Sequence, residues 1–86
     1  MHYVYFLKSL SNNKVYVGYT NDLRRRIDEH NNRRGGKYTK NKGPFALVYY
    51  EAYKSEKDAK RREIGLKLHK KAYAQLKTRI IESLKS

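Results

Sequence analysis

Five side chains of this sequence are best suited to act on a phosphate group. They carry two phenols, a guanidinium, an imidazole and a carboxylate: Tyr5, Tyr16, Arg26, His30 and Glu63. A phenol can accept a proton from water, and a guanidinium matches the geometry of phosphate oxygens. A carboxylate can bind Mg²⁺, which often takes only one or two protein carboxylates beside a substrate phosphate. These groups can act together only if the fold brings them to one place.

A predicted hairpin positions the two tyrosines. Residues 2–8 and 14–19 are rich in β-branched and aromatic side chains, which indicates strands, and turn-forming residues lie between them. Because side chains alternate along a strand, any even-length turn puts Tyr5 and Tyr16 on the same face. Gly18 lies on that face without a side chain, which predicts a notch that a substrate can approach. Packing is the alternative role for both tyrosines, since strands favour this residue.

A predicted helix from Leu23 to about Asn31 places Arg26 and His30 one turn apart. Leu23 and Ile27 mark the buried stripe of this helix, and the pair lies on one flank of the stripe. A cation at the edge of the core needs an anionic partner or a polar cleft. The alternatives are a structural salt bridge for Arg26 and a capping or surface role for His30.

Glu63 lies on the predicted buried stripe of a helix that begins near Ser55 and runs to about Leu68. It follows Ala59 by four residues and precedes Leu66 by three, so its carboxylate is placed among apolar side chains. That position is unfavourable unless the carboxylate is paired or binds a metal. Neighbouring bases can supply a plain ion pair, and a magnesium site is the other interpretation.

The chain is strongly basic, with 21 Lys and Arg against 8 Asp and Glu and a net charge of +13. A charge of this size indicates a polyanionic partner, with nucleic acid first and an anionic membrane surface second. We expect phosphate contacts from the first helix and from a basic loop over residues 31–44: Arg25, Arg33, Arg34, Lys37, Lys40 and Lys42. An ordinary solvated loop is the alternative for this segment.

The remaining elements complete a small α/β (α+β) fold in the order β-β-α-β-α-α. Residues 45–53 indicate a third strand, and residues 71–84 a last helical stretch. We expect one domain over residues 1–86, with a small antiparallel three-stranded sheet flanked by helices. The absence of cysteine excludes disulfides and thiolate metal sites and suits a reducing compartment. The amino terminus has no long apolar run, so we expect no signal peptide or spanning helix and a cytoplasmic protein. We expect no membrane partner, because the basic terminal helix lacks the aromatic content typical of membrane-surface anchors.

The ordered set of chemical residues resembles the GIY-YIG endonuclease superfamily, in the form of its small stand-alone members. Val4-Tyr5-Phe6 is similar to the first motif through its tyrosine, and Tyr16-Val17-Gly18 matches the second motif. Arg26 falls ten residues after Tyr16, where the family carries its helix arginine. His30 resembles the histidine of the homing-endonuclease branch, and Glu63 resembles the metal-binding glutamate of the family.

The resemblance implies a metal-dependent endonuclease that hydrolyses phosphodiester bonds, usually in DNA, with structured or damaged DNA and RNA also among the candidate substrates. It implies one Mg²⁺ or Mn²⁺ ion held by Glu63, and an Arg26 guanidinium that stabilises charge on the phosphate. Either Tyr5 or Tyr16 would act as the base or position the water. A non-catalytic nucleic-acid-binding module is the alternative, since positive charge and exposed tyrosines suffice for it. The sequence leaves the oligomeric state open.

Overall fold

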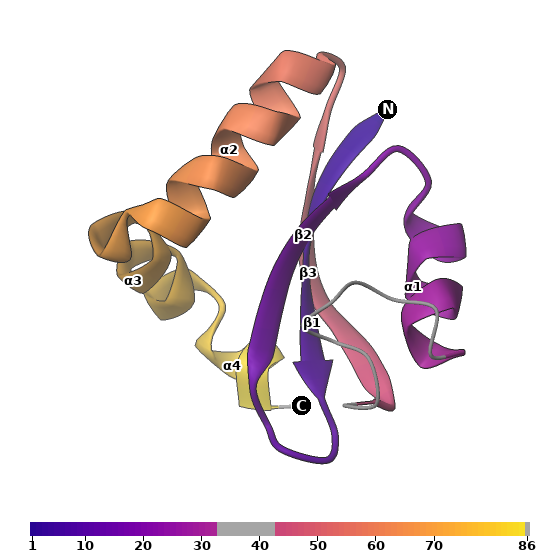
Figure 1. Ribbon diagram of the computed structural model, residues 1–86. Coiled ribbons are helices and arrows are strands. Elements are labelled where there is room, and N and C mark those ends of the chain that lie inside the picture. The colour runs from indigo at the N-terminus through magenta and orange to yellow at the C-terminus, as the bar shows by residue number, and fades with distance from the viewer. Residues whose placement is uncertain (33–42, 86) are drawn as a thin grey trace.

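The computed structural model describes residues 1–32 and 43–85, and its strands form one antiparallel sheet. The strands are β1 (His2–Ser9), β2 (Val15–Thr20) and β3 (Phe45–Tyr53), in the order β2-β1-β3 (Figure 1). The predicted α+β fold and its three strands are confirmed. Outside the described residues lie five of the predicted phosphate contacts: Arg33, Arg34, Lys37, Lys40 and Lys42.

Helices lie on both faces of this sheet. Figure 1 shows α1 (Leu23–Asn31) on one side, and α2 (Glu56–Leu68), α3 (Lys70–Arg79) and α4 (Ile81–Lys85) on the other. None of the helices within the two described ranges has both the length and the apolar character needed to cross a membrane.

Two predicted helix starts are confirmed by their caps. The Asp22 carboxylate accepts a hydrogen bond from the backbone N–H of Arg25 at 3.1 Å. Ser55 Oγ accepts one from the backbone N–H of Asp58 at 3.3 Å. Each cap satisfies a donor that the first helical turn leaves unpaired, so both helices begin where the sequence predicts.

The predicted last helix is divided in two at Ile80. This buried residue has ψ 27°, and it separates α3 from α4. Two successive β-branched residues, Ile80 and Ile81, favour the interruption because their side chains are restricted in a helix. After the break α4 is tied to β1, since Lys8 Nζ donates to the Leu84 carbonyl oxygen at 2.7 Å. A lysine at the carboxyl end of a helix also interacts favourably with the helix dipole.

Alternation along β1 divides the core into two layers. The larger layer packs between the sheet and the α2–α4 side: Val4, Phe6, Ala59, Leu66, Leu76 and Ile80. The smaller layer packs under α1, and its buried members are Tyr5, Leu7 and Phe45, with three partly buried residues beside them, Tyr16, Leu23 and Ile27. Tyr5 therefore lies on the α1 face of the sheet.

Asn31 joins the end of α1 to the start of β3. Its Nδ2 donates to the Phe45 carbonyl oxygen at 3.3 Å, and its Oδ1 accepts from the Phe45 N–H at 2.7 Å. These two bonds hold the last turn of α1, which carries His30, against the sheet.

Glu51 on β3 accepts hydrogen bonds from three side chains of the larger layer. Arg62 donates through Nε and Nη2 at 2.9 and 3.2 Å, and the hydroxyls of Tyr49 and Tyr53 donate at 2.6 and 2.5 Å. Burial alone would raise the pKa of Glu51, but these hydrogen bonds outweigh it and hold that pKa below its ordinary value. Burial and the bond to the carboxylate raise the pKa of each tyrosine to about 12.

We expect Glu51→Gln to lower the free energy of unfolding by about 2 kcal/mol, because it leaves a partly buried guanidinium without its counter-charge. Urea unfolding measures this loss. Because the pKa of Glu51 is lowered on folding, the stabilisation is complete above about pH 4.3, the unfolded value, and is lost as the pH falls further. A matched control is Glu82→Gln, whose side chain is 90% exposed; its effect should stay within about 0.5 kcal/mol. Equal losses in both variants would contradict the stabilising role of this network.

Candidate active site

The Tyr5 ring lies directly over Gly18. In the sheet register Tyr5 pairs with Gly18 and Leu7 pairs with Tyr16, so the two tyrosines share a face as predicted, and that face is the one covered by α1. A Cβ atom at Gly18 would be only 2.3 Å from the Tyr5 hydroxyl oxygen and 2.4 Å from Cζ. The expected notch at Gly18 is therefore filled by the protein itself. The glycine lets the phenol extend across β2 toward the edge of the sheet.

The Tyr5 hydroxyl lies 3.0 Å from Nε2 of His30, and both side chains are buried. The His30 ring also makes edge contacts with the rings of Tyr5 and Phe45. Burial, reinforced by the nearby Arg26 charge, holds the pKa of His30 below its ordinary value. The imidazole is therefore neutral at pH 7, and a neutral imidazole has one nitrogen able to accept a proton.

Arg26 brings a positive charge to the same hydroxyl. Burial raises the pKa of Tyr5, and the Arg26 guanidinium offsets part of that rise by favouring the phenolate. The guanidinium also pairs with Glu29 at 3.3 Å, and its side chain remains 27% exposed. A salt bridge is thus part of its environment, as the alternative interpretation held. The exposed fraction leaves donors available to an incoming anion.

Glu63 lies on α2, on the face of the sheet opposite α1. Burial raises the pKa of Tyr5, and the Glu63 charge adds to that rise; burial and the Glu56 charge raise the pKa of Tyr19, with a smaller contribution from Glu63. Its side chain is 20% exposed, in keeping with its place on the predicted buried stripe, and Lys67 Nζ lies 3.0 Å from Oε2, which is the ion pair of the alternative interpretation. Lys67 is itself half exposed, so this ion pair is open to solvent. Among the described strands β2 pairs with β1 alone, so it forms an edge of the sheet that groups from both layers can reach.

Tyr16 is placed differently from Tyr5. Its ring makes an edge contact with Phe45, and its hydroxyl accepts a hydrogen bond from Asn12 Nδ2 at 3.3 Å. It belongs to the layer under α1 and lies two residues from Gly18 on the same face. These contacts agree with the alternative in which Tyr16 is a packing residue, although the residue as a whole is partly exposed.

The donor set for a metal ion is small. Within the described part of the chain no group of three or more His, Cys, Asp or Glu side chains could hold an ion. Glu63 offers a single carboxylate that now faces an ammonium group. This set does not fit a cage made of protein ligands, but it fits a magnesium-type ion that keeps its waters and shares a substrate phosphate.

Three features of this region were not predicted from the sequence. Tyr19 is a third phenol near Glu63, and it also bonds to His2 Nδ1 at 2.8 Å and to Glu56 at 3.4 Å. The others are the contact that fills the space over Gly18 and the hydrogen bonds around Glu51. The alternation of Tyr, Glu and Tyr along residues 49–53 was the available signal for the last of these.

Arg25, one predicted phosphate contact, is exposed and donates to Asn21 Oδ1 at 3.2 Å.

Comparison with known proteins gives matches over most of the chain. The GIY-YIG catalytic domain matches residues 1–77. A UPF0213 protein of Staphylococcus haemolyticus is 42% identical over 81 residues, which is 94% of each chain. A UPF0213 protein of Clostridium perfringens is 45% identical over 67 residues, which is 78% of this chain and 71% of the relative. The solution NMR structure of the UPF0213 protein from Bacillus halodurans has a TM-score of 0.56 at 41% identity, covering 90% of this chain and 82% of that one.

Proposed function

The chain belongs to the GIY-YIG family, a nuclease family, and from this premise we propose that it is a metal-dependent endonuclease that hydrolyses phosphodiester bonds in DNA. The observation that carries the proposal is the Tyr5 hydroxyl, which lies 3.0 Å from a neutral imidazole and within the fields of Arg26 and Glu63. A base, a phosphate-binding cation and a carboxylate for an ion are the three groups that phosphodiester hydrolysis needs.

Tyr5 is the phenol that takes the proton from water in this proposal. Its raised pKa keeps it protonated at neutral pH, so it must lose a proton before it can accept one. Nε2 of His30 accepts that proton at 3.0 Å as the hydroxyl takes one from the attacking water. Tyr16, whose ring packs on Phe45, helps to position the water or the phosphate.

Arg26 and Glu63 act on the phosphate. The partly exposed guanidinium of Arg26 donates to the non-bridging oxygens as negative charge builds on them. Glu63 would hold one Mg²⁺ or Mn²⁺ ion, which when bound polarises the phosphate and assists departure of the 3′ oxygen. The half-exposed Lys67 ammonium must then leave the carboxylate, and its four-carbon side chain is long enough to swing into solvent.

Supercoiled plasmid incubated with the purified protein tests the proposal. We expect conversion to nicked circles with Mg²⁺ and none with chelator. A non-catalytic nucleic-acid-binding module would shift the plasmid on a gel without breaking it, with steep salt dependence and no need for metal. Binding without nicking on plasmid, branched and single-stranded DNA and RNA would overturn the nuclease proposal.

Cleavage should require the neutral form of His30. Because burial holds the pKa of this residue below its ordinary value, we expect the midpoint of the acidic fall in rate to lie below about pH 6.5. The free energy of unfolding should also decrease as the pH falls below about 6.5. His30 binds a proton more readily in the unfolded chain than in the folded one, so acid favours unfolding. Single-turnover rates from pH 5 to 8, compared with His30→Gln, measure the effect. An acidic limb that survives in the variant would assign the titration to another group.

A further inference from the structure

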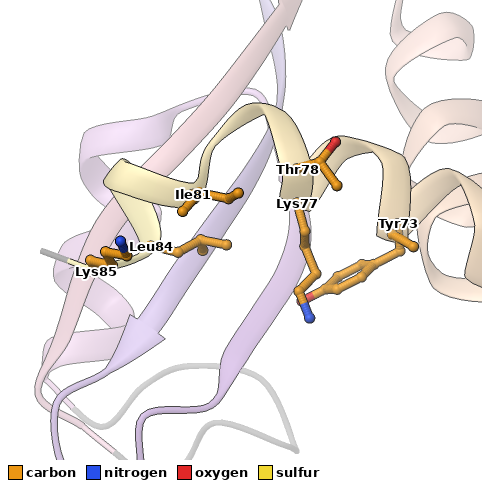
Figure 2. A pocket seen from close by; sticks show the side chains of 7 residues that line it. Tyr73, Lys77, Thr78, Ile81, Leu84 and Lys85 are labelled. Atoms are coloured by element: carbon orange, nitrogen blue, oxygen red, sulfur yellow. The ribbon is translucent and has the colours of Figure 1, made fainter.

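A groove with a volume of about 540 Å³ lies at the junction of α3 and α4, in the layer opposite α1. Four side chains form its apolar walls: Tyr73, Ala74, Ile81 and Leu84. Figure 2 shows Ile81 and Leu84 on the short α4 segment, with Tyr73 and Lys77 on α3. Ile81 is 49% exposed although the neighbouring Ile80 is buried, so the break between the helices leaves an aliphatic side chain in solvent. A volume of this size is typical of sites that hold a ligand.

The charged groups that line the groove are both cations. They are Lys77 and Lys85, and hydroxyl groups are present on Tyr73 and Thr78. The acid closest in sequence is Glu82, which approaches Lys85 at 3.8 Å, but its side chain is 90% exposed and does not line the groove. An aliphatic surface with a cationic rim is complementary to an apolar side chain flanked by carboxylates.

We propose that this groove binds an acidic peptide segment of a partner protein, with an aliphatic side chain of the peptide seated against Ile81 and Leu84. The partner carboxylates would lie against Lys77 and Lys85. This inference goes beyond the proposed nuclease function and does not depend on it.

Charge argues against two other occupants. A second copy of the chain would bring a net charge of +13 and a second pair of lysines to the same rim. Residues 33–42 of this chain carry five bases and no acid, so they do not complement the rim either. The partner must therefore be another, acidic molecule.

The Tyr73 ring makes a nucleobase a poor occupant. It stacks on Phe6, with the ring planes 13° apart and the centroids separated by 5.7 Å. Lys77 Nζ lies 5.2 Å from its centroid, as expected for a cation over a ring face. Because both partners already occupy this ring, it offers little surface for base stacking, and the remaining walls are aliphatic.

The test is a titration of the full chain against a fluorescein-labelled peptide of four acidic residues followed by Leu-Ile-Leu, with binding followed by anisotropy. The double variant Lys77→Glu/Lys85→Glu should weaken binding about tenfold or more, since it reverses the rim charge. Ile81→Ser should weaken it about fivefold by removing the aliphatic contact, without changing the salt dependence. Amide shifts in a ¹⁵N spectrum should cluster in residues 73–85. Plasmid nicking, if present, should be the same in all these variants.

Matched controls decide the outcome. Lys54→Glu/Lys57→Glu makes the same change of net charge at exposed residues before and within α2, and Leu68→Ser removes a side chain that is 71% exposed and outside the groove. Thermal melts establish that each variant is folded, and Lys85→Glu alone serves if the double variant is not. Equal weakening by groove and control variants would overturn the proposal. So would a single-stranded oligonucleotide that shifts the same amides and depends on Ile81, because the groove would then be a nucleic-acid site.

Discussion

Replacing Arg26 by alanine should lower the rate of metal-dependent cleavage by about 10² to 10³-fold. The expected effect is large because the guanidinium hydrogen-bonds the Tyr5 hydroxyl and its side chain remains 27% exposed, so it can reach an incoming phosphate. DNA affinity should change little, since one phosphate contact among many supplies only a small part of the binding free energy of a chain with net charge +13. Single-turnover nicking at saturating protein separates the two quantities.

Arg24→Ala is the matched control for this experiment. Arg24 is exposed on the same helix, and removing it takes away the same charge without altering the site. We expect its single-turnover rate to equal that of the unmodified chain. If Arg26→Ala cleaves as fast as Arg24→Ala, the guanidinium at position 26 does not act on the phosphate, and its pair with Glu29 is its whole role.

The Gly18→Ala variant should be both less stable and nearly inactive. The new methyl group would lie 2.3 Å from the Tyr5 hydroxyl oxygen and 2.4 Å from Cζ, so the buried ring must move. Overpacking of this kind costs about 1–3 kcal/mol of stability, and a displacement of about 1 Å can reduce catalysis about 10²-fold. Urea unfolding and single-turnover nicking measure the two losses.

Gly65→Ala makes the same chemical change where there is room for it. Its new Cβ would have His69 Cδ2 as its nearest neighbour, at 4.0 Å, and alanine stabilises a helix interior by up to about 1 kcal/mol relative to glycine. This control should therefore be slightly more stable than the unmodified chain. A Gly18→Ala variant with unchanged stability and cleavage would show that the Tyr5 ring does not lie over β2.

The fold followed from local patterns that the sequence displays directly. Segments rich in β-branched and aromatic residues indicated the three strands of the sheet, and the helices predicted to begin at Leu23 and near Ser55 are capped by Asp22 and Ser55. The helical region predicted over residues 71–84 was harder to predict. The spacing of its apolar residues continues through Ile80, but the helical backbone is interrupted there. The successive β-branched residues Ile80 and Ile81 are a weak local signal for the break, and the burial of Ile80 in the core is the tertiary feature that accompanies it.

The candidate site could be predicted in its members but not in its contacts. Alternation placed Tyr5 and Tyr16 on one face, whereas the register that sets Tyr5 over Gly18 depends on the hairpin turn closed by the Ser9–Lys14 backbone bond. The electrostatic effect of Glu63 on Tyr5 was also beyond local patterns, because it depends on α1 and α2 flanking opposite faces of the sheet. The sequence suggested that each residue was unusual, and the fold supplies the neighbours of each one.

The most direct test of the account compares the unmodified chain with Glu63→Gln on supercoiled plasmid, each with Mg²⁺ and each with chelator. The variant keeps the shape of the side chain and removes the charge that would hold the ion. We predict nicked circles from the unmodified chain with Mg²⁺ alone, and none from the variant under either condition although it still shifts the plasmid on a gel. Equal nicking by both proteins would show that the carboxylate at position 63 has no part in the reaction and would contradict the site described above.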